Sequence, residues 1–165
     1  MSLREDIRGT AELLQMICVN RRLRIATVES CTGGLIAGAI TEIPGASDYF
    51  DRGFVTYSNA AKAELGVPAD LIERFGAVSA EVAIAMAEGA LATSGTDLTL
   101  SVTGIAGPGG GTPEKPVGLV HFGVARRGER THQERVVFPD NGRSGIRQAA
   151  VLAALQLMIR RLAPA

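Results

Sequence analysis

Apolar residues recur at helical spacing near both ends of the chain. In residues 4–20 the apolar positions are Ile7, Leu13, Leu14, Ile17 and Cys18, a pattern that predicts an amphipathic helix. In residues 143–162 they are Ile146, Val151, Leu155, Met158 and Leu162, which share one helix face. Each predicted helix therefore has one side suited to pack against a core.

Five shorter apolar runs, rich in β-branched residues, predict strands. They span residues 23–28, 53–57, 98–105, 118–125 and 132–138. Residues 126–129, between the last two runs, have the composition of a hairpin turn.

Four further helices are predicted. Two cover residues 35–43 and 68–75. A short one follows a cap at Ser58 or Asn59, and a longer one runs from an N-cap at Ser79 to Leu91. The order of elements is helix, two strands, helices, three strands, helix, and helices on both faces of a mixed sheet would bury these elements best. We therefore predict one domain over residues 1–165 with an α/β fold, a three-layer α/β/α sandwich around a mixed sheet of about five strands.

Composition narrows the function classes. Apolar residues make up 46% of the chain and charged residues 21%, which is typical of a soluble globular domain. Because 17 basic and 17 acidic side chains cancel, no net field favours nucleic acid or an anionic membrane as a partner. Aromatic residues are only 4% and Trp is absent, so base-stacking platforms are disfavoured as well. We expect no nucleic acid and no membrane among the partners.

Two cysteines, Cys18 and Cys31, are too few for a disulfide framework. No apolar run reaches the roughly 20 residues of a transmembrane helix. The N-terminus is charged where a signal peptide would turn apolar. We expect a cytoplasmic protein with reduced thiols.

The first candidate for chemistry is Ser30, which follows a predicted strand and precedes a predicted helix. A nucleophile there lies beside unpaired backbone N–H groups, so an oxyanion hole is expected from the backbone of Cys31, Thr32, Gly33 and Gly34. From the residues alone, two alternatives stay open. Ser30 and Thr32 could simply cap the helix, or Cys31 could be the nucleophile, activated by the same helix dipole.

The second candidate is Lys62, because a serine without a histidine base can be activated by a neutral lysine amine. The pKa of that amine must fall from about 10.4 towards 7 or 8, which requires a packed and partly apolar setting. Lys62 lies among alanines and a leucine. Tyr57 could relay a proton or donate to the substrate. The alternatives are a solvated helix lysine and a core tyrosine at a strand end.

A glycine-rich loop and two arginines are candidates for holding an anion. Residues 103–112 contain five glycines at the end of a predicted strand, which indicates backbone N–H groups around an anion. The spacing fits neither the P-loop nor the dinucleotide fingerprint. Arg143 and Arg147 are four residues apart on one face of the last predicted helix and could grip a phosphate. The alternatives are a flexible surface loop and solvated arginines.

Metal chemistry finds little support in the sequence. His121 and His132 fall in separate predicted strands, and no cluster of Cys, His and Asp has ligand spacing. We interpret His121 as a satisfied strand residue and expect no metal site.

Several motifs occur in one order along the chain, at residues 29–34, 53–59 with Lys62, 76–79, 103–108 and 115–118. Together they resemble the C-terminal domain of the competence/damage-inducible protein CinA, a family whose standalone form is the nicotinamide-nucleotide amidohydrolase of the PncC type. The resemblance runs over essentially the whole chain. Its length leaves no room for the additional N-terminal domain of longer members, so we expect the standalone form.

The resemblance implies hydrolysis of the carboxamide of nicotinamide mononucleotide, giving nicotinate mononucleotide and ammonia without a cofactor. It implies Ser30 as nucleophile with Lys62 and Tyr57 as activating partners, and it makes Cys31 a neighbour. The candidates for holding the pyridine nucleotide are then Thr103, Gly104, Gly107, Thr112 and Arg143. Many members read Gly-Asp-Arg where this chain has Asn-Gly-Arg at residues 141–143, so the loop before Arg143 departs from the family pattern.

Two other hypotheses remain. CinA-type domains also occur fused to other modules, so the chain could be a non-catalytic nucleotide-binding or competence/damage-related interaction module. A hydrolase for a different amide is the third hypothesis. We expect a homo-oligomer, with a dimer favoured.

Overall fold

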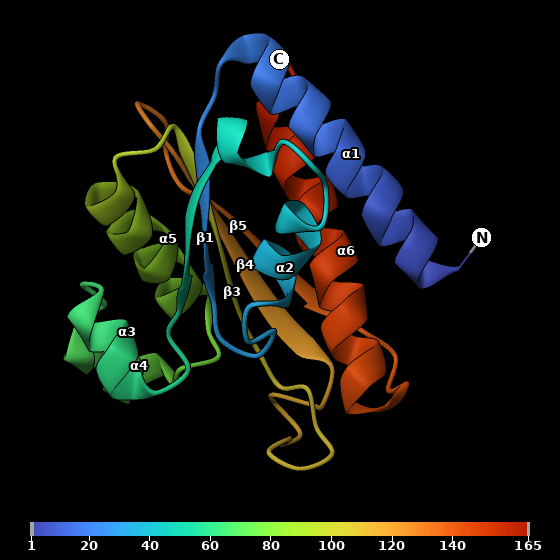
Figure 1. The fold of residues 1–165 in the computed structure, drawn as a ribbon. Coiled ribbons are helices and arrows are strands. Elements are labelled where there is room, and N and C mark those ends of the chain that lie inside the picture. The colour runs from blue at the N-terminus through green and yellow to red at the C-terminus, as the bar shows by residue number, and fades with distance from the viewer. Residues whose placement is uncertain (1, 165) are drawn as a thin grey trace.

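The computed structural model describes residues 2–164 and centres on a five-stranded sheet with the order β2-β1-β3-β4-β5 (Figure 1). The strands are β1 (Ile25–Glu29), β2 (Phe50–Val55), β3 (Leu98–Gly104), β4 (Leu119–Arg126) and β5 (His132–Val137). β1 pairs in parallel with β2 and β3, whereas the β3–β4 and β4–β5 pairs are antiparallel. The mixed sheet confirms the predicted α/β fold class.

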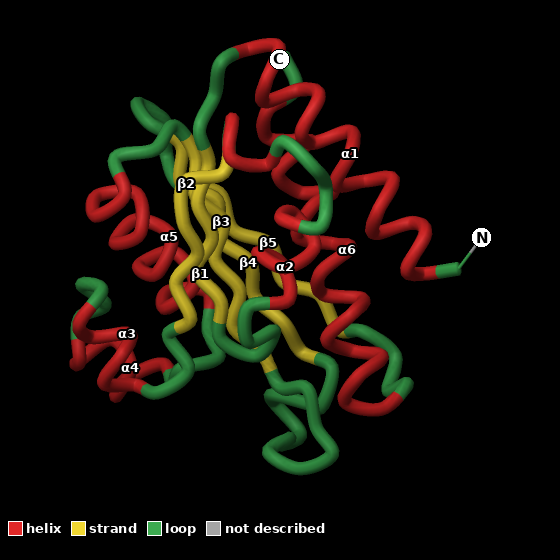
Figure 2. Tube along the Cα trace, viewed as in Figure 1, coloured by secondary structure: helices red, strands yellow, loops and turns green. Residues whose placement is uncertain are grey.

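Helices cover both faces of this sheet (Figures 1 and 2). On one face lie α1 (Leu3–Arg21), α2 (Leu35–Thr41) and α6 (Gly142–Leu162), with α1 packed along α6. On the other face lie α3 (Asn59–Glu64), α4 (Ala69–Phe75) and α5 (Ala80–Ser94). A short 3₁₀ helix, η1 (Ala46–Asp48), leads into β2. The arrangement is the predicted three-layer sandwich.

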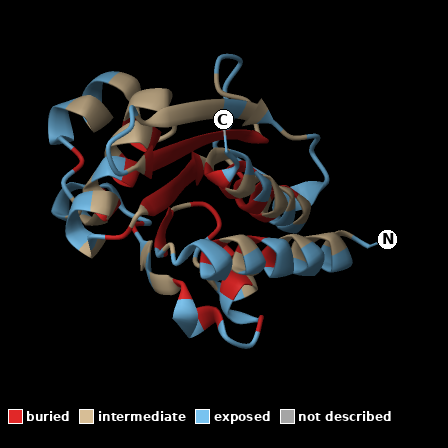
Figure 3. Cartoon of the chain, turned by 90° about the horizontal axis from the view of Figure 1, so that it is seen from above, coloured by how far each residue is buried: buried red, intermediate tan, exposed pale blue. Residues whose placement is uncertain are grey.

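The two faces of the sheet are covered in different ways. The larger apolar core fills the space between the sheet and α1, α2 and α6, and the smaller one joins β1 to α4 and α5. The strands in the middle of the sheet are buried throughout (Figure 3). β3 alternates accordingly: Leu98, Leu100 and Val102 face the larger core, and the polar residues between them face α5.

Those polar residues of β3 attach the sheet to α5. The buried hydroxyls of Thr99 and Ser101 donate to the backbone carbonyls of Ala87 and Ala83, at 2.6 and 2.5 Å. Because a buried hydroxyl without a partner is costly, these bonds also explain why polar side chains are tolerated here. They fix the position of α5 on the sheet.

The structure corrects one strand. β2 was predicted at residues 53–57 but covers Phe50–Val55. It begins earlier because an edge strand can expose its polar residues to solvent. It ends earlier because the carbonyls of Thr56 and Tyr57 accept hydrogen bonds from a lysine side chain instead of continuing the strand.

The predicted helix caps are confirmed where the sequence offers a serine. The Ser58 hydroxyl accepts the N–H of Ala61 at the start of α3, and the Ser79 hydroxyl accepts the N–H of Val82 at the start of α5. The hairpin turn at residues 126–129 is also present, with Glu129 N–H donating to the Arg126 carbonyl at 3.0 Å. Over residues 2–164, no helix combines the length and apolar character needed to cross a bilayer.

Candidate active site

Three chain segments meet at one end of the sheet. β1, β2 and β3 run in the same direction, so their carboxyl ends lie at the same edge, in the lower part of Figure 2. Ser30 follows β1 directly, and Thr56 and Tyr57 follow β2. In open α/β sheets this edge is where ligands bind.

Ser30 continues the sheet by one residue. Its N–H donates to the carbonyl of Val102 on β3 at 3.0 Å. Its side chain leaves the strand end and accepts a hydrogen bond at Oγ from the amine Nζ of Lys62 at 3.1 Å. The sheet therefore fixes the backbone of Ser30 while its hydroxyl faces a base.

Lys62 is buried, with 1% of its surface exposed. Besides Ser30, its amine donates to the carbonyls of Thr56 at 2.8 Å and Tyr57 at 3.2 Å. Within the described residues no carboxylate lies within 4.0 Å of it. Burial lowers the pKa of Lys62 below its usual range, because the charged form loses its hydration without gaining a counter-charge.

This geometry suits a neutral amine that acts as a base. A neutral lysine has two N–H bonds and one lone pair. In the neutral form, the two backbone carbonyls can accept the two N–H bonds, which leaves the lone pair for the Ser30 hydroxyl as donor. An amine in this position can accept the serine proton as the oxygen attacks a substrate.

The turn at residues 31–34 leaves several donors unused. Gly33 N–H donates to the Ser30 carbonyl at 3.0 Å. Among the hydrogen bonds of the described residues, none is donated by the N–H of Cys31, Thr32 or Gly34. Three of the four predicted oxyanion donors are therefore free to bind a ligand.

Neither Ser30 nor Thr32 caps α2, so that alternative is wrong. The N-cap residue is Gly34, which has no side chain to accept a hydrogen bond. The acceptor comes from Glu29, whose buried carboxylate accepts the N–H of Ile36 at 2.9 Å and of Ala37 at 3.0 Å. The Thr32 hydroxyl donates to the same carboxylate at 2.6 Å.

The environment of Cys31 differs from that of Ser30. Its thiol is 8% exposed, and burial raises its pKa to about 11, with a smaller contribution from the nearby Glu29 charge. A thiol with this pKa stays protonated at neutral pH and is a weak nucleophile. Composition left Ser30 and Cys31 equivalent, and burial favours Ser30.

Tyr57 and Arg143 meet across the site. The Tyr57 side chain is 60% exposed, and its hydroxyl accepts a hydrogen bond from Arg143 at 3.1 Å. Arg143 also donates to the Gly107 carbonyl at 2.9 Å, so it joins α6 to the glycine-rich loop. No hydrogen bond of the described residues links the Tyr57 hydroxyl to Ser30 or Lys62. It is the Tyr57 backbone carbonyl that reaches the lysine.

In the loop at residues 103–112, two predicted ligands have structural partners. The Thr103 hydroxyl is buried and donates to the Ala77 carbonyl at 2.7 Å. The Thr112 hydroxyl accepts the N–H of Lys115 at 3.0 Å. Gly107 has φ 76° and lies against Val117, where a Cβ would come within 2.7 Å. Gly104 packs equally closely on β4. The loop is therefore folded on itself beside the site.

Two residues important for the site were missed or misread in the sequence. Glu29 had no role assigned, although it directly precedes Ser30. Arg147 was considered for phosphate, but its guanidinium donates to the carbonyls of Cys31 at 3.0 Å and Thr32 at 3.1 Å. The one signal in the sequence that Arg147 lies near the site was its position one helical turn after Arg143. Among residues 2–164, no group of three or more His, Cys, Asp or Glu is placed to hold a metal ion.

Comparison with known proteins gives consistent matches. A family model described as the CinA C-terminal domain matches residues 8–162. A CinA-like protein of Akkermansia muciniphila is 55% identical over 134 residues, which cover 81% of this chain and 32% of that protein. A putative competence-damage inducible protein of Caldicellulosiruptor saccharolyticus is 50% identical over 155 residues, covering 93% and 37%. The chain thus spans about a third of the length of these curated relatives.

Solved structures match over almost the whole chain. The competence/damage inducible protein CihA from Agrobacterium tumefaciens has a TM-score of 0.92 and 48% identity, covering 94% of both chains. A competence-damaged protein (CinA) superfamily protein from Escherichia coli has a TM-score of 0.88 and 32% identity, covering 95% of this chain and 90% of that one. Sequence and fold therefore indicate the same relationship.

Proposed function

This chain belongs to the CinA C-terminal domain family, and from that premise we propose that it is a nicotinamide-nucleotide amidohydrolase. Its substrate is nicotinamide mononucleotide, and its products are nicotinate mononucleotide and ammonia. The observation that carries the proposal is the buried Lys62 amine, which lies 3.1 Å from the Ser30 hydroxyl and has no carboxylate partner in the described residues.

In the first step Ser30 Oγ attacks the carboxamide carbon and its proton passes to neutral Lys62. The carbonyl oxygen becomes an oxyanion, which the free N–H groups of the turn at residues 31–34 bind. One well-placed donor of this kind contributes about 3–4 kcal/mol to transition-state stabilisation. The C–N bond then breaks, and the leaving amine takes the proton from Lys62 and departs as ammonia.

In the second step water hydrolyses the acyl-enzyme. Lys62, neutral again, takes a proton from water as the hydroxide attacks the ester carbon. The C–O bond to Ser30 breaks, Ser30 recovers its proton from Lys62, and the carboxylic acid formed loses its proton to solvent and leaves as nicotinate mononucleotide. Each step uses the same base.

Tyr57 and Arg143 form the opposite wall. The exposed Tyr57 ring offers an apolar face for a pyridine ring. Arg143 has five N–H donors, and the contacts with Gly107 and Tyr57 use only part of them. The remaining donors, together with Gly104, Gly107 and the loop at residues 103–112, are our candidates for the nucleotide part of the substrate.

The test is ammonia release from nicotinamide mononucleotide by wild type and by Ser30→Ala, Lys62→Ala and Cys31→Ala. We expect the first two variants to lose about 10⁴-fold in kcat or more. Cys31→Ala should stay within a few-fold of wild type, because its thiol is protonated and buried. Activity that survives Ser30→Ala but is lost in Cys31→Ala would overturn the nucleophile assignment.

The chain matches about a third of the length of longer relatives. For this reason we retain a second candidate function, that of a nucleotide-binding or interaction module. Binding of nicotinamide mononucleotide by calorimetry, without ammonia release from any pyridine nucleotide, would favour that module. Ammonia release from another amide in a substrate panel would instead retain the hydrolase and change its substrate.

A further inference from the structure

The turn after Ser30 contains backbone hydrogen bonds from Gly33 N–H to the Ser30 carbonyl and from Leu35 N–H to the Thr32 carbonyl, but neither bond involves the N–H of Cys31, Thr32 or Gly34. Gly33 and Gly34 both have positive φ, 57° and 100°, and Gly34 is the N-cap of α2 without a capping side chain. Two consecutive glycines impose little conformational preference. The direction of the free N–H groups in this turn must therefore be set by contacts from outside it.

One contact comes from the sheet side. The Glu29 carboxylate uses Oε1 for the Thr32 hydroxyl at 2.6 Å and for Ile36 N–H at 2.9 Å, and Oε2 for Ala37 N–H at 3.0 Å. A carboxylate suits this place because both its oxygens only accept, whereas an amide would turn a donor towards another donor. Its negative charge is also favourable at a helix N-terminus. Glu29 thus ties the turn to the residue directly before the nucleophile.

The other contact comes from α6. The Arg147 guanidinium holds the carbonyls of Cys31 and Thr32 at 3.0 and 3.1 Å. In a trans peptide the carbonyl and the following N–H point in opposite directions. With the Cys31 carbonyl held towards α6, the N–H of Thr32 in the same peptide points away from α6; Thr32 is fully buried, and none of the described residues accepts this N–H.

We propose that Glu29 and Arg147 are positioning residues that hold the turn from two sides and so set the direction in which its unbonded N–H groups meet the oxyanion. The inference rests on the proposed function, since it assigns the arrangement to the same acyl transfer. Neither side chain touches the substrate. Both act through the turn.

The sharpest test is a pair of substitutions at Thr32. Thr32→Val keeps the shape but removes the hydroxyl that reaches Glu29, and Thr32→Ser restores the hydroxyl. Thr41→Val is the matched control, because the Thr41 hydroxyl bonds only to carbonyls of its own helix, α2. We expect Thr32→Val to lose at least about 10-fold in kcat with little change in KM, and Thr32→Ser to recover most of that loss.

On the other side of the turn, Arg147→Met should lose kcat to a similar degree. Arg160→Met is its control, because Arg160 lies at the far end of α6 and pairs with Glu134 at the surface. Equal kcat in Arg147→Met and Arg160→Met would overturn the role of Arg147.

The readout that separates positioning from stability is covalent labelling of Ser30 by a fluorophosphonate. Attack of Ser30 Oγ on phosphorus expels fluoride, and the phosphoryl oxygen occupies the oxyanion hole. The amount of label bound when the reaction is complete gives the number of folded sites. The labelling rate constant of those sites reports how well Ser30 and the oxyanion donors are aligned. A purely structural role would lower the count and the melting temperature but leave the rate per site unchanged, and that result would overturn the proposal.

The labelling arm does not depend on the natural substrate. If wild type is labelled at Ser30 but releases no ammonia from nicotinamide mononucleotide, the proposed substrate is wrong, and the Thr32 comparison still decides the positioning role. If Thr32→Val is labelled as fast per site as wild type, the positioning role of Glu29 is wrong, whatever the substrate.

Discussion

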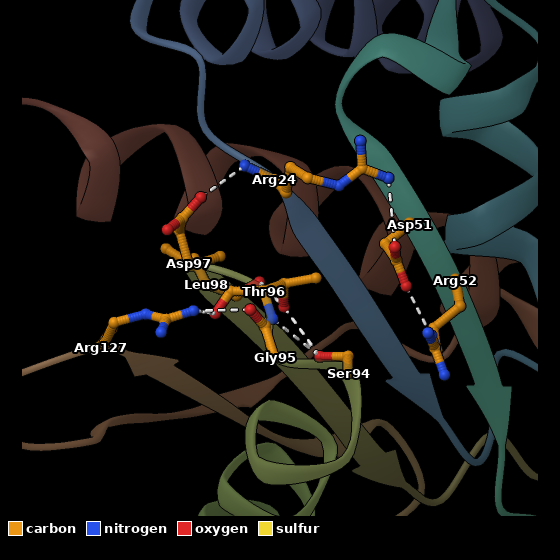
Figure 4. A network of polar contacts seen from close by, with 9 residues as sticks. All are labelled: Arg24, Asp51, Arg52, Ser94, Gly95, Thr96, Asp97, Leu98 and Arg127. Carbon is orange, nitrogen blue, oxygen red and sulfur yellow. Dashed lines mark hydrogen bonds and ion pairs between the residues drawn. The ribbon is translucent and has the colours of Figure 1, made fainter.

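At the amino end of the central sheet, Arg24 and Arg52 lie near the surface and share one carboxylate, whereas at the carboxyl end Glu29 and Lys62 are buried and neither pairs with an opposite charge among the described residues. Figure 4 shows the amino end: Arg24 and Arg52 both contact the Asp51 carboxylate, and Asp97 accepts the backbone N–H of Arg24 at 2.8 Å. Surface pairs of this kind contribute little to stability and weaken with salt.

The carboxyl end keeps its buried carboxylate and its buried amine apart. Glu29 is satisfied by N–H and hydroxyl donors, and Lys62 by carbonyls and Ser30. Had they paired with each other, the carboxylate would have favoured the charged lysine and raised its pKa. Keeping them apart leaves Lys62 with a lowered pKa. The two ends therefore differ in how their charges are held: the surface charges pair with each other, and the buried charges are satisfied by backbone groups and hydroxyls, which suits the base that we propose for Lys62.

The largest effect is expected from replacing the lysines. The chain has two, Lys62 and Lys115, and each is replaced in turn. Lys62→Met should lower kcat by about 10⁴-fold or more, because it removes the base. Lys115→Met is the matched control: the amine of that lysine donates to the Phe75 carbonyl and to no other acceptor among the described residues, and kcat should be retained. Steady-state ammonia release measures both. Comparable loss in the two variants would remove the special role of the buried amine.

A second test uses pH. Only the neutral form of Lys62 can accept a proton, so kcat/KM should rise with pH through its lowered pKa. The same shift affects stability. Between the native pKa and the unfolded value of about 10.4, the unfolded state binds more protons, so the free energy of unfolding should rise with pH over that range.

Urea unfolding between pH 8 and pH 10 measures this dependence. In Lys62→Met the free energy of unfolding should rise less with pH, because the contribution of Lys62 is lost. In Lys115→Met it should rise with pH as in wild type. Identical slopes in wild type and Lys62→Met would mean that Lys62 is not destabilised as an ammonium in the native state.

The smallest effect is expected at the amino end. Asp51→Asn removes the carboxylate shared by two arginines, yet kcat should be unchanged and the melting temperature should fall only slightly. That slight fall should disappear in high salt, because screening already weakens the pairs in wild type. A clear loss of kcat in Asp51→Asn would show that the two ends of the sheet are coupled.

Local patterns in the sequence predicted much of this molecule. The strand runs, the serine caps of α3 and α5 and the apolar faces of the terminal helices depend on neighbouring residues, and each was predicted close to its place. The carboxyl ends of β1 and β2 also follow from topology, so Ser30 and Lys62 could be expected to meet once the family motifs were recognised.

Contacts between distant residues were harder to predict. The Glu29 contact to α2 depends on the fold of a glycine turn, and the Arg147 contact joins residues 116 positions apart. Thr103 is a similar case: the family resemblance made it a candidate for holding the nucleotide, and its hydroxyl donates to the Ala77 carbonyl, a contact that the sequence did not indicate. Sequence patterns indicate which residues are polar and near an end of the sheet. Which partner each one meets is decided by packing.

The hydrogen bond from Ser30 N–H to the Val102 carbonyl has a consequence for amide exchange with solvent. That N–H belongs to the centre of the sheet, so its hydrogen should exchange only when β1 and β3 separate, near the free energy of global unfolding. The next two amides, of Cys31 and Thr32, are buried but donate to no acceptor among the described residues, so they should exchange through smaller local openings than the Ser30 amide. A boundary between slower and faster amides thus falls between adjacent residues: Ser30, our proposed nucleophile, is anchored in the centre of the sheet, and the unbonded N–H groups beside it belong to a turn that can open while the strands stay paired.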